Sequence, residues 1–237
     1  MTRPAPADDE LLPQGPEKAR AVRSMFDAIA PRYDLVNRIM TLGMDVGWRR
    51  RTVRTIALPP GSTVADLACG TGDLCRELAR AGHRPLGFDL SFNMLAAART
   101  GAPLVHADAL VLPVPDASMD GATCGFALRN VVDLAAFFTE LARVVRPGGR
   151  IGLLEVAQPP NRVLARGHAF YFGTVVPRIG ALLSDGAAYR YLPRSVAYLP
   201  EPSEMLAMLG RVGFADAERM LLSGGIAQLL HATRDAR

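Results

Sequence analysis

The spacing of hydrophobic residues changes once along the chain, near the Pro-Pro-Gly-Ser stretch at residues 59–62. Before it, from Glu17 to Arg54, apolar residues recur every three or four positions, which is typical of amphipathic helices. Pro31 breaks or restarts this pattern because proline lacks a backbone donor. We therefore expect at least two short helices, which form a helical cap over residues 17–58. Residues 1–16 are rich in Pro, Ala and Asp and predict a flexible tail.

Beyond this point short apolar runs alternate with helical patterns. The runs predict strands at Thr63–Leu67, Pro85–Phe88, Leu104–His106, Met119–Cys124, Arg150–Glu155, 216–222 and 226–233. The helical patterns lie at about 73–81, 91–99, 133–145 and 202–212, and the RPGGR stretch at 146–150 predicts a turn after the third of them. Strand–helix alternation predicts an α/β fold: a mostly parallel seven-stranded sheet with helices on both faces and an antiparallel last strand.

Residues 160–200 do not follow this alternation. They hold four of the five tyrosines together with many Pro and Gly residues. We expect a helical insertion here, within a single domain that runs from residue 17 to residue 237.

Composition supports one packed domain and narrows its partners. The chain has 237 residues, of which 49% are hydrophobic and 21% charged. The net charge is +4, and Lys18 is the only lysine, which we interpret as genomic base composition. Basic residues do not gather with aromatics along one face, so we expect no nucleic-acid partner.

The cysteine count and the hydropathy pattern bear on the location of the protein. The three cysteines form no C-x-x-C pair, which favours reduced thiols in the cytoplasm and argues against a metal site. The N-terminus has no signal-peptide pattern, and no run of eighteen apolar residues exists. We therefore expect a cytoplasmic protein without a membrane span.

A glycine-rich turn follows the first predicted strand, in the stretch DLACGTGDLC at residues 66–75. Gly70 and Gly72 allow positive φ and a close approach of the backbone to a ligand. The stretch departs from the dinucleotide fingerprint because Cys75 stands at the third glycine position. Asp66 and Asp73 would repel a pyrophosphate but suit a cationic ligand such as S-adenosylmethionine. The alternative is a tight turn with incidental acids.

Acidic residues also follow the next two predicted strands. Asp89 ends the second strand, where a carboxylate can bind two ribose hydroxyls. Asp108 and Ala109 follow the third strand, where an adenine would lie. The alternatives are a helix N-cap at Asp89 and a capped turn at Asp108.

Four stretches, spread from about residue 17 to 234, are similar to the UbiE family of quinone-biosynthesis C-methyltransferases. They are MFDAIAPRYDLVNRIMTLGMDVGWRR, VADLACGTGDL, FALRNVVD and VVPRIGALLSDGAAYRYLPRSV. The resemblance implies a Rossmann-like class I methyltransferase fold and S-adenosylmethionine as cofactor. It implies cofactor contacts at Thr71, Asp89, Asp108 and Ala109, and a backbone contact at Gly125, where many members carry serine. Asp45, Val46 and Ala127 also depart from the family pattern, which leaves the acceptor ring open.

The implied reaction is methylation of a ring carbon of a hydroquinone, and it requires loss of a phenolic proton. Arg129 and Asn130 follow the fourth predicted strand and are our first catalytic candidates, to stabilise the phenolate and orient its oxygen. Tyr33 and Asp34 follow as ring contact and general base. The alternatives are a salt bridge that fixes the loop and a core tyrosine. His168 is the only histidine of the expected insertion, and we favour a structural role for it over that of a general base.

The resemblance makes demethylmenaquinol the first candidate for a prenylated quinol substrate. A ubiquinone-pathway benzoquinol, another small aromatic acceptor, and a non-catalytic scaffold in a quinone-synthesis complex are the alternatives. The apolar insertion is then either a core helix or a channel for the isoprenoid tail. The WRRRTVR stretch at residues 48–54 is either a solvated helix face or a site of transient contact with the inner face of the membrane. The oligomeric state is left open.

Overall fold

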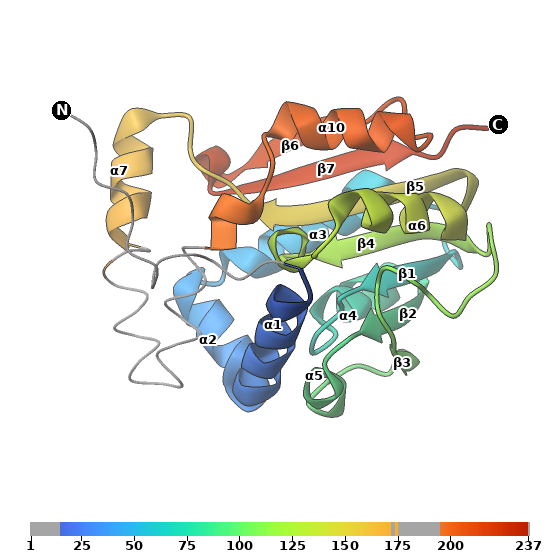
Figure 1. Ribbon diagram of the computed structural model, residues 1–237, viewed down its shortest axis with the longest axis horizontal. Coiled ribbons are helices and arrows are strands. Elements are labelled where there is room, and N and C mark those ends of the chain that lie inside the picture. The colour runs from blue at the N-terminus through green and yellow to red at the C-terminus, as the bar shows by residue number, and fades with distance from the viewer. Residues whose placement is uncertain (1–14, 172–173, 175–194, 237) are drawn as a thin grey trace.

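The computed structural model describes residues 15–171, 174 and 195–236 (Figure 1). The chain begins with a set of helices: α1 (Gly15–Ile29), the 3-10 turn η2 (Ala30–Arg32), α2 (Tyr33–Met40) and α3 (Met44–Ile56). Pro31 lies in η2, where its ring breaks the helical run between α1 and α2, as predicted. Residues 1–14 of the tail expected over 1–16, and most of the expected insertion, lie outside the described residues, while Gly15 and Pro16 begin α1 instead of ending the tail.

Seven strands form one sheet in the order β3-β2-β1-β4-β5-β7-β6. They are β1 (Thr63–Leu67), β2 (Arg84–Asp89), β3 (Leu104–His106), β4 (Met119–Gly125), β5 (Val145–Val156), β6 (Glu218–Leu222) and β7 (Ala227–Thr233). The first five are parallel, and β7 runs antiparallel to both β5 and β6. The predicted fold class, including the antiparallel last strand, is therefore confirmed.

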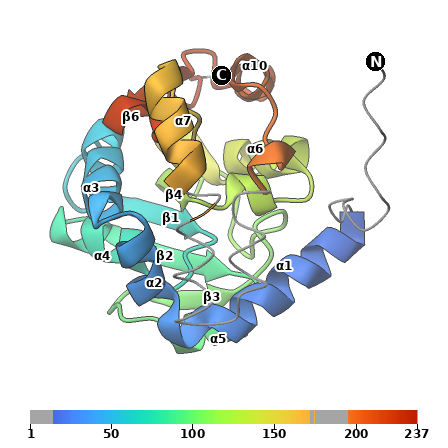
Figure 2. The ribbon, with the colours of Figure 1, turned by 90° about the vertical axis from the view of Figure 1, so that its left-hand side faces the viewer.

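Helices cover both faces of the sheet. The helices that follow α3 in the chain are α4 (Asp73–Arg80), α5 (Phe92–Ala96), α6 (Leu134–Val144), α7 (Arg162–Phe170) and α10 (Pro202–Arg211), with 3-10 turns η3 (Leu128–Asn130), η5 (Val196–Tyr198) and η6 (Ser223–Gly225). Figure 2 shows α3 and α4 on one side of the sheet and α6 and α10 on the other. The α6 and α10 side holds the largest core, which includes the fully buried Phe137, Phe138 and Phe214. Burying each such ring contributes about 1.5–3 kcal/mol.

The N-terminal helices have their own small core. Ile29, Val36 and Met40 pack with Met94 of α5, next to Phe26 and Tyr33. This cluster attaches α1 and α2 to the sheet at the end where β1 and β2 finish (Figure 1). The helices therefore lie over the carboxyl ends of the parallel strands, where ligands bind in folds of this type.

The RPGGR stretch differs from its predicted structure. Helix α6 ends at Val144, and β5 begins at once at Val145, so residues 146–150 lie in a strand and the predicted turn is wrong. Gly148 adopts φ 76° there, and the β4–β5 register shifts between Met119 and Gly121. Its amide donates to the Arg234 carbonyl at 2.8 Å, so the irregular strand is held by β7's continuation. A bulged strand and a turn use the same Pro-Gly chemistry, which is why the sequence pattern misled.

No helix in the described part of the chain is long and apolar enough to cross a membrane.

Candidate active site

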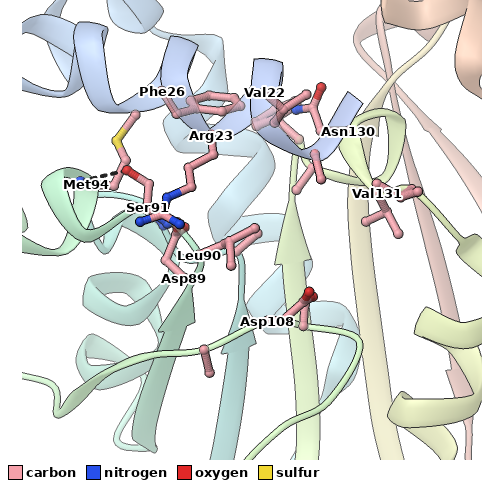
Figure 3. A pocket seen from close by; sticks show the side chains of 18 of the residues that line it. Val22, Arg23, Phe26, Asp89, Leu90, Ser91, Met94, Asp108, Asn130 and Val131 are labelled. Atoms are coloured by element: carbon pink, nitrogen blue, oxygen red, sulfur yellow. Dashed lines mark hydrogen bonds between the residues drawn. The ribbon is translucent and has the colours of Figure 1, made fainter. Parts of the chain in front are cut away.

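A cleft lies between α1 and the carboxyl ends of the parallel strands (Figure 3). About 910 Å³ of space is free of protein atoms there, open solvent at the mouth included. The predicted site residues that line it are Tyr33, Gly70, Asp89, Asp108, Ala109, Gly125 and Asn130. The structure thus brings together residues from six separate segments of the chain.

The glycine turn after β1 is held by the carboxylate of Asp89. Gly70 donates its amide to Asp89 Oδ2 at 2.7 Å, and Ser91 donates its amide to Oδ1 at 2.8 Å. Gly70 has φ 56°, and an added Cβ would meet no atom within 4 Å, so its backbone faces open space at the cleft. Burial raises the pKa of Asp89. The two lone pairs on each oxygen leave this carboxylate able to accept further hydrogen bonds from a ligand.

Gly72 has a different role from Gly70. Its φ is 82°, and a Cβ there would lie 2.6 Å from Thr100 Cγ2. It does not line the cleft, so its glycine is required by the packing of the turn rather than by a ligand.

The side walls of the cleft come from the ends of β3 and β4. Asp108 and Ala109 follow β3, and Asp108 Oδ1 accepts the Leu110 amide at 2.9 Å, so the capped turn is formed. The Asp108 side chain is exposed and keeps its second oxygen for other donors. Gly125 ends β4, where a Cβ would lie 2.9 Å from Leu74 Cδ1. The serine common at this position in the resembling family would crowd that leucine.

Helix α1, part of the expected helical cap, forms the roof of the cleft, but sequence reasoning did not single out the α1 residues that contact it. Figure 3 shows Arg23 reaching from α1 toward Asp89 and Ser91, with Phe26 beside it. Asp27 fixes the helix in place because its Oδ1 accepts the Ser91 hydroxyl at 2.5 Å. The signal was the spacing of Arg23 and Phe26 on one helix face, but the sequence alone does not say which element that face contacts.

Asp66 and Thr71, both predicted to bind the cofactor, lie outside the cleft lining. Asp66 is buried beneath the turn, where its Oδ1 accepts the Thr123 hydroxyl at 2.8 Å and its Oδ2 accepts the Cys75 thiol at 3.3 Å. Burial raises the pKa of Asp66 to about 7. Thr71 donates its hydroxyl to Asp34 Oδ1, which joins the turn to the start of α2. Asp34 also lies 3.8 Å from Arg76.

Tyr33, Phe126 and Asn130 also line the cleft, and the Tyr33 ring packs on Phe26 with 5.9 Å between centroids. Burial raises the pKa of the Tyr33 hydroxyl, while the positive charges of Arg129 and Arg49 oppose that rise. These two guanidinium groups therefore offset part of the effect of burial on an oxygen at this place. Arg49 itself lies over the Phe126 ring, 5.5 Å from its centroid.

Arg129 is buried and forms an ion pair with Glu155, which is fully buried on β5. Its backbone amide also donates to Glu155 Oε2 at 3.1 Å. The side chain does not line the cleft, so the structure supplies the salt bridge that fixes the loop. The catalytic role of Arg129 stays a prediction, as does that of Asp34. His168 lies in α7, and its side chain is outside the described residues.

Asp45, which departs from the family pattern, lies in an ion-pair network beneath the turn. Its carboxylate pairs with Arg49, accepts the Thr41 hydroxyl at 2.8 Å, and lies 3.9 Å from Arg38. Arg49 and Arg38 also reach Asp73, at 3.3 and 3.5 Å. The WRRRTVR stretch is therefore divided, because Trp48 and Arg49 are buried while Arg50 and Arg51 face solvent.

The residues of the cleft fit S-adenosylmethionine. The open backbone at Gly70 and the partly buried carboxylate of Asp89 suit a ribose, and Asp108 with Ala109 suits an amino-purine edge. The carboxylates of Asp89 and Asp108 in the lining also attract a cationic ligand. Among the described residues, no cluster of three or more His, Cys, Asp or Glu residues is placed to hold a metal ion.

Comparison with known proteins agrees with these features. Residues 14–234 match the model of the ubiE/COQ5 methyltransferase family. A ubiquinone/menaquinone biosynthesis C-methyltransferase UbiE of Syntrophotalea carbinolica is 42% identical over 221 residues, which cover 90% of this chain and 93% of that protein. A demethylmenaquinone methyltransferase of Roseiflexus castenholzii is 41% identical over 227 residues, which cover 92% and 95% of the two chains.

Solved structures share the fold at low sequence identity. A SAM-dependent methyltransferase of Thermotoga maritima, described as a possible histamine N-methyltransferase, superposes with a TM-score of 0.61 at 18% identity. The match covers 89% of this chain and 98% of that one. At such identity the likeness concerns the fold alone.

Proposed function

The chain belongs to the ubiE/COQ5 methyltransferase family, and from this premise we propose that it methylates a ring carbon of demethylmenaquinol with S-adenosylmethionine as donor. The observation that carries the proposal is one cleft with two chemically different sets of lining residues: Asp89, Asp108 and the open backbone of Gly70, and Tyr33, Phe126 and Asn130. The proposal assigns the first set to a polar end that holds the cofactor and the second set to an aromatic end that holds the acceptor ring.

The polar end holds the cofactor in this proposal. Asp89 accepts hydrogen bonds from the ribose hydroxyls and also from the Gly70 amide. One carboxylate therefore both binds the ribose and fixes the glycine turn. Asp108 accepts from the adenine amine, and the Ala109 backbone completes the purine contact. When bound, the cofactor supplies an electrophilic methyl group on a positively charged sulfur. Arg23 and Phe26 of α1 cover this end and exclude water from it.

The aromatic end holds the quinol ring. Phe126 and Tyr33 offer ring faces, and Asn130 orients a phenolic oxygen. The charges of Arg49 and Arg129 oppose the effect of burial on the Tyr33 hydroxyl, and in the proposal they offset in the same way part of the cost of burying the phenolate that pushes electron density onto the ring carbon. Arg129 acts through its position behind the loop, since its guanidinium is engaged by Glu155.

The apolar surroundings of this end suit a prenylated acceptor. Val131 and Val132, which follow Asn130 in the chain, line the cleft, as does Leu90 next to Asp89, and a long isoprenoid tail favours such surfaces over water. We extend the proposal to brief contact with a membrane surface, because a prenylated quinol partitions into lipid. Arg50 and Arg51, which face solvent, supply the attraction to anionic lipid.

The test is incubation of the purified protein and labelled S-adenosylmethionine with a panel of reduced acceptors, followed by mass spectrometry. The panel contains demethylmenaquinol, a ubiquinone-branch benzoquinol and a naphthohydroquinone without a tail. We expect the highest kcat/KM for demethylmenaquinol. A preference for the benzoquinol would overturn the ring assignment, and cofactor binding without any product would favour a non-catalytic scaffold.

A further inference from the structure

Lys18, the only lysine of the chain, is buried in α1 with 5% of its surface exposed. Its Nζ donates to the Val131 carbonyl at 2.8 Å. The same ammonium lies over the ring of Tyr198 in η5, 3.8 Å from the centroid. Through this one charged group, helix α1 contacts the loop after β4 and the segment that begins at residue 195.

Among the described residues, no carboxylate forms an ion pair with the Lys18 ammonium, and burial lowers the pKa of Lys18 to about 8. A cation in such a place is costly unless something compensates, and here the compensation is one carbonyl and one aromatic face. An ammonium suits this narrow space better than the planar, five-donor guanidinium that supplies every other basic side chain of this protein.

The contacts of Lys18 flank the cleft. Ala19 and Val22, one and four residues further along α1, line it from above. Asn130 and Val131 line it from the loop whose carbonyl Lys18 holds. Loss of this hydrogen bond would let α1 and the loop after β4 move apart. The side-chain amide of Asn130, next to Val131, would then shift as well.

We propose that Lys18 is a positioning residue that closes α1 onto the acceptor loop and so fixes Asn130 for the reaction. The proposal rests on the methyltransferase function above. It assigns Lys18 no contact with either substrate. A small displacement of a group that orients the substrate lowers the reaction rate by a large factor. We therefore expect loss of the Lys18 contacts to lower kcat more than it lowers the free energy of unfolding.

The main variant is Lys18→Met, which keeps length and burial but removes the charge. Methionine leaves the Val131 carbonyl without its donor but also removes the cost of burying a charge, so we expect the melting temperature to change by only a few degrees. We expect kcat for demethylmenaquinol to fall at least about tenfold, with the Kd for S-adenosylmethionine, measured by calorimetry, changed less than about threefold. Hydrogen exchange of the α1 amides should speed up without any substrate present.

Two further variants sharpen the result. Lys18→Arg keeps the charge in a larger group and should recover part of kcat. Arg20→Met removes one positive charge from an exposed position of the same helix and should leave kcat and exchange unchanged.

The proposal is overturned if Lys18→Met matches the wild type in both the hydrogen exchange of its α1 amides and its kcat. It is also overturned if the loss of kcat is accompanied by a large fall in melting temperature, because general destabilisation would then account for it. The exchange measurement needs no catalysis. If the wild type fails to methylate the quinol, the proposed function fails, while faster exchange in α1 of Lys18→Met still supports the closure that Lys18 provides.

Discussion

Thr71, in the glycine turn after β1, donates its hydroxyl hydrogen to the carboxylate of Asp34 at the start of α2. This contact joins the cofactor end of the cleft to the helices that cover it. Asp34 was expected to act as a general base, and its place against the turn offers a second role, that of holding the helical cap closed. The two roles predict different kinetics.

Thr71→Val removes the hydroxyl and keeps the shape. Because hydrogen bonds to charged groups contribute about 1.5–3 kcal/mol, we expect cofactor Kd to rise about tenfold or more as the cap loosens. Asp34→Asn should give a similar rise in Kd. Calorimetry with S-adenosylmethionine measures both Kd values. Thr139→Val, at an exposed position of α6, is the matched control. A loss of kcat with unchanged Kd in Asp34→Asn would instead support the general base.

Asp89→Ala should weaken S-adenosylmethionine binding by about 1.5–3 kcal/mol, because a charged acceptor for the ribose is lost. The same change frees the Gly70 amide, so the turn loosens as well. Asp116→Ala removes an exposed carboxylate far from the cleft and should leave affinity unchanged. Equal calorimetric affinities for Asp89→Ala and the wild type would refute the ribose assignment.

Arg129 requires mild substitutions, because removal of one partner of a buried ion pair costs about 3–5 kcal/mol. Arg129→Lys keeps the charge but loses the planar fork, and we expect kcat to fall at least about tenfold with little change in cofactor Kd. Glu155→Gln leaves the guanidinium in place with a weaker partner. It should lower kcat in the same direction if Arg129 acts through its position. Normal turnover in both variants would remove this loop from the mechanism.

Asp66 predicts a pH dependence of stability. Burial raises its pKa from 3.8 to about 7, so between these values the folded protein binds a proton that the unfolded chain has lost. The contribution of Asp66 to the free energy of unfolding is therefore fully present below pH 3.8 and is lost as the pH rises through about 7.

Asp66→Asn cannot titrate and provides the comparison. We expect the melting temperature of the wild type, minus that of the variant, to fall by a few degrees between about pH 4 and about pH 8. Asp89, whose pKa is also raised, remains in both proteins and cancels in the difference. A difference that is flat across this range would show that Asp66 is not protonated by folding.

Much of the fold was predictable because β-strand and helix periodicities are local. Thr63–Leu67 and Leu104–His106 were predicted to the residue, since apolar runs there are bounded by clear turn residues. The 146–150 stretch was not, because a bulged strand and a turn draw on the same Pro and Gly residues. Which strand neighbours which is a tertiary property, and pattern alone did not supply the order.

The candidate site was predictable where backbone position decides it. Gly70, Asp89 and Asp108 follow strand ends, and parallel strands bring those ends to one edge. The partners of long side chains were not predictable: Arg129 with Glu155, and Lys18 with Tyr198, join segments far apart in the chain. The part that Arg23 and Phe26 of α1 take in lining the cleft was missed for the same reason.

The most direct test of the central claim uses S-adenosylmethionine with an isotopically labelled methyl group and demethylmenaquinone in reduced and oxidised form. We predict a labelled menaquinol, methylated on ring carbon and formed in equal amount with S-adenosylhomocysteine, from the reduced acceptor only. Absence of labelled product from protein that binds the donor, or a label found on a ring oxygen, would contradict the account.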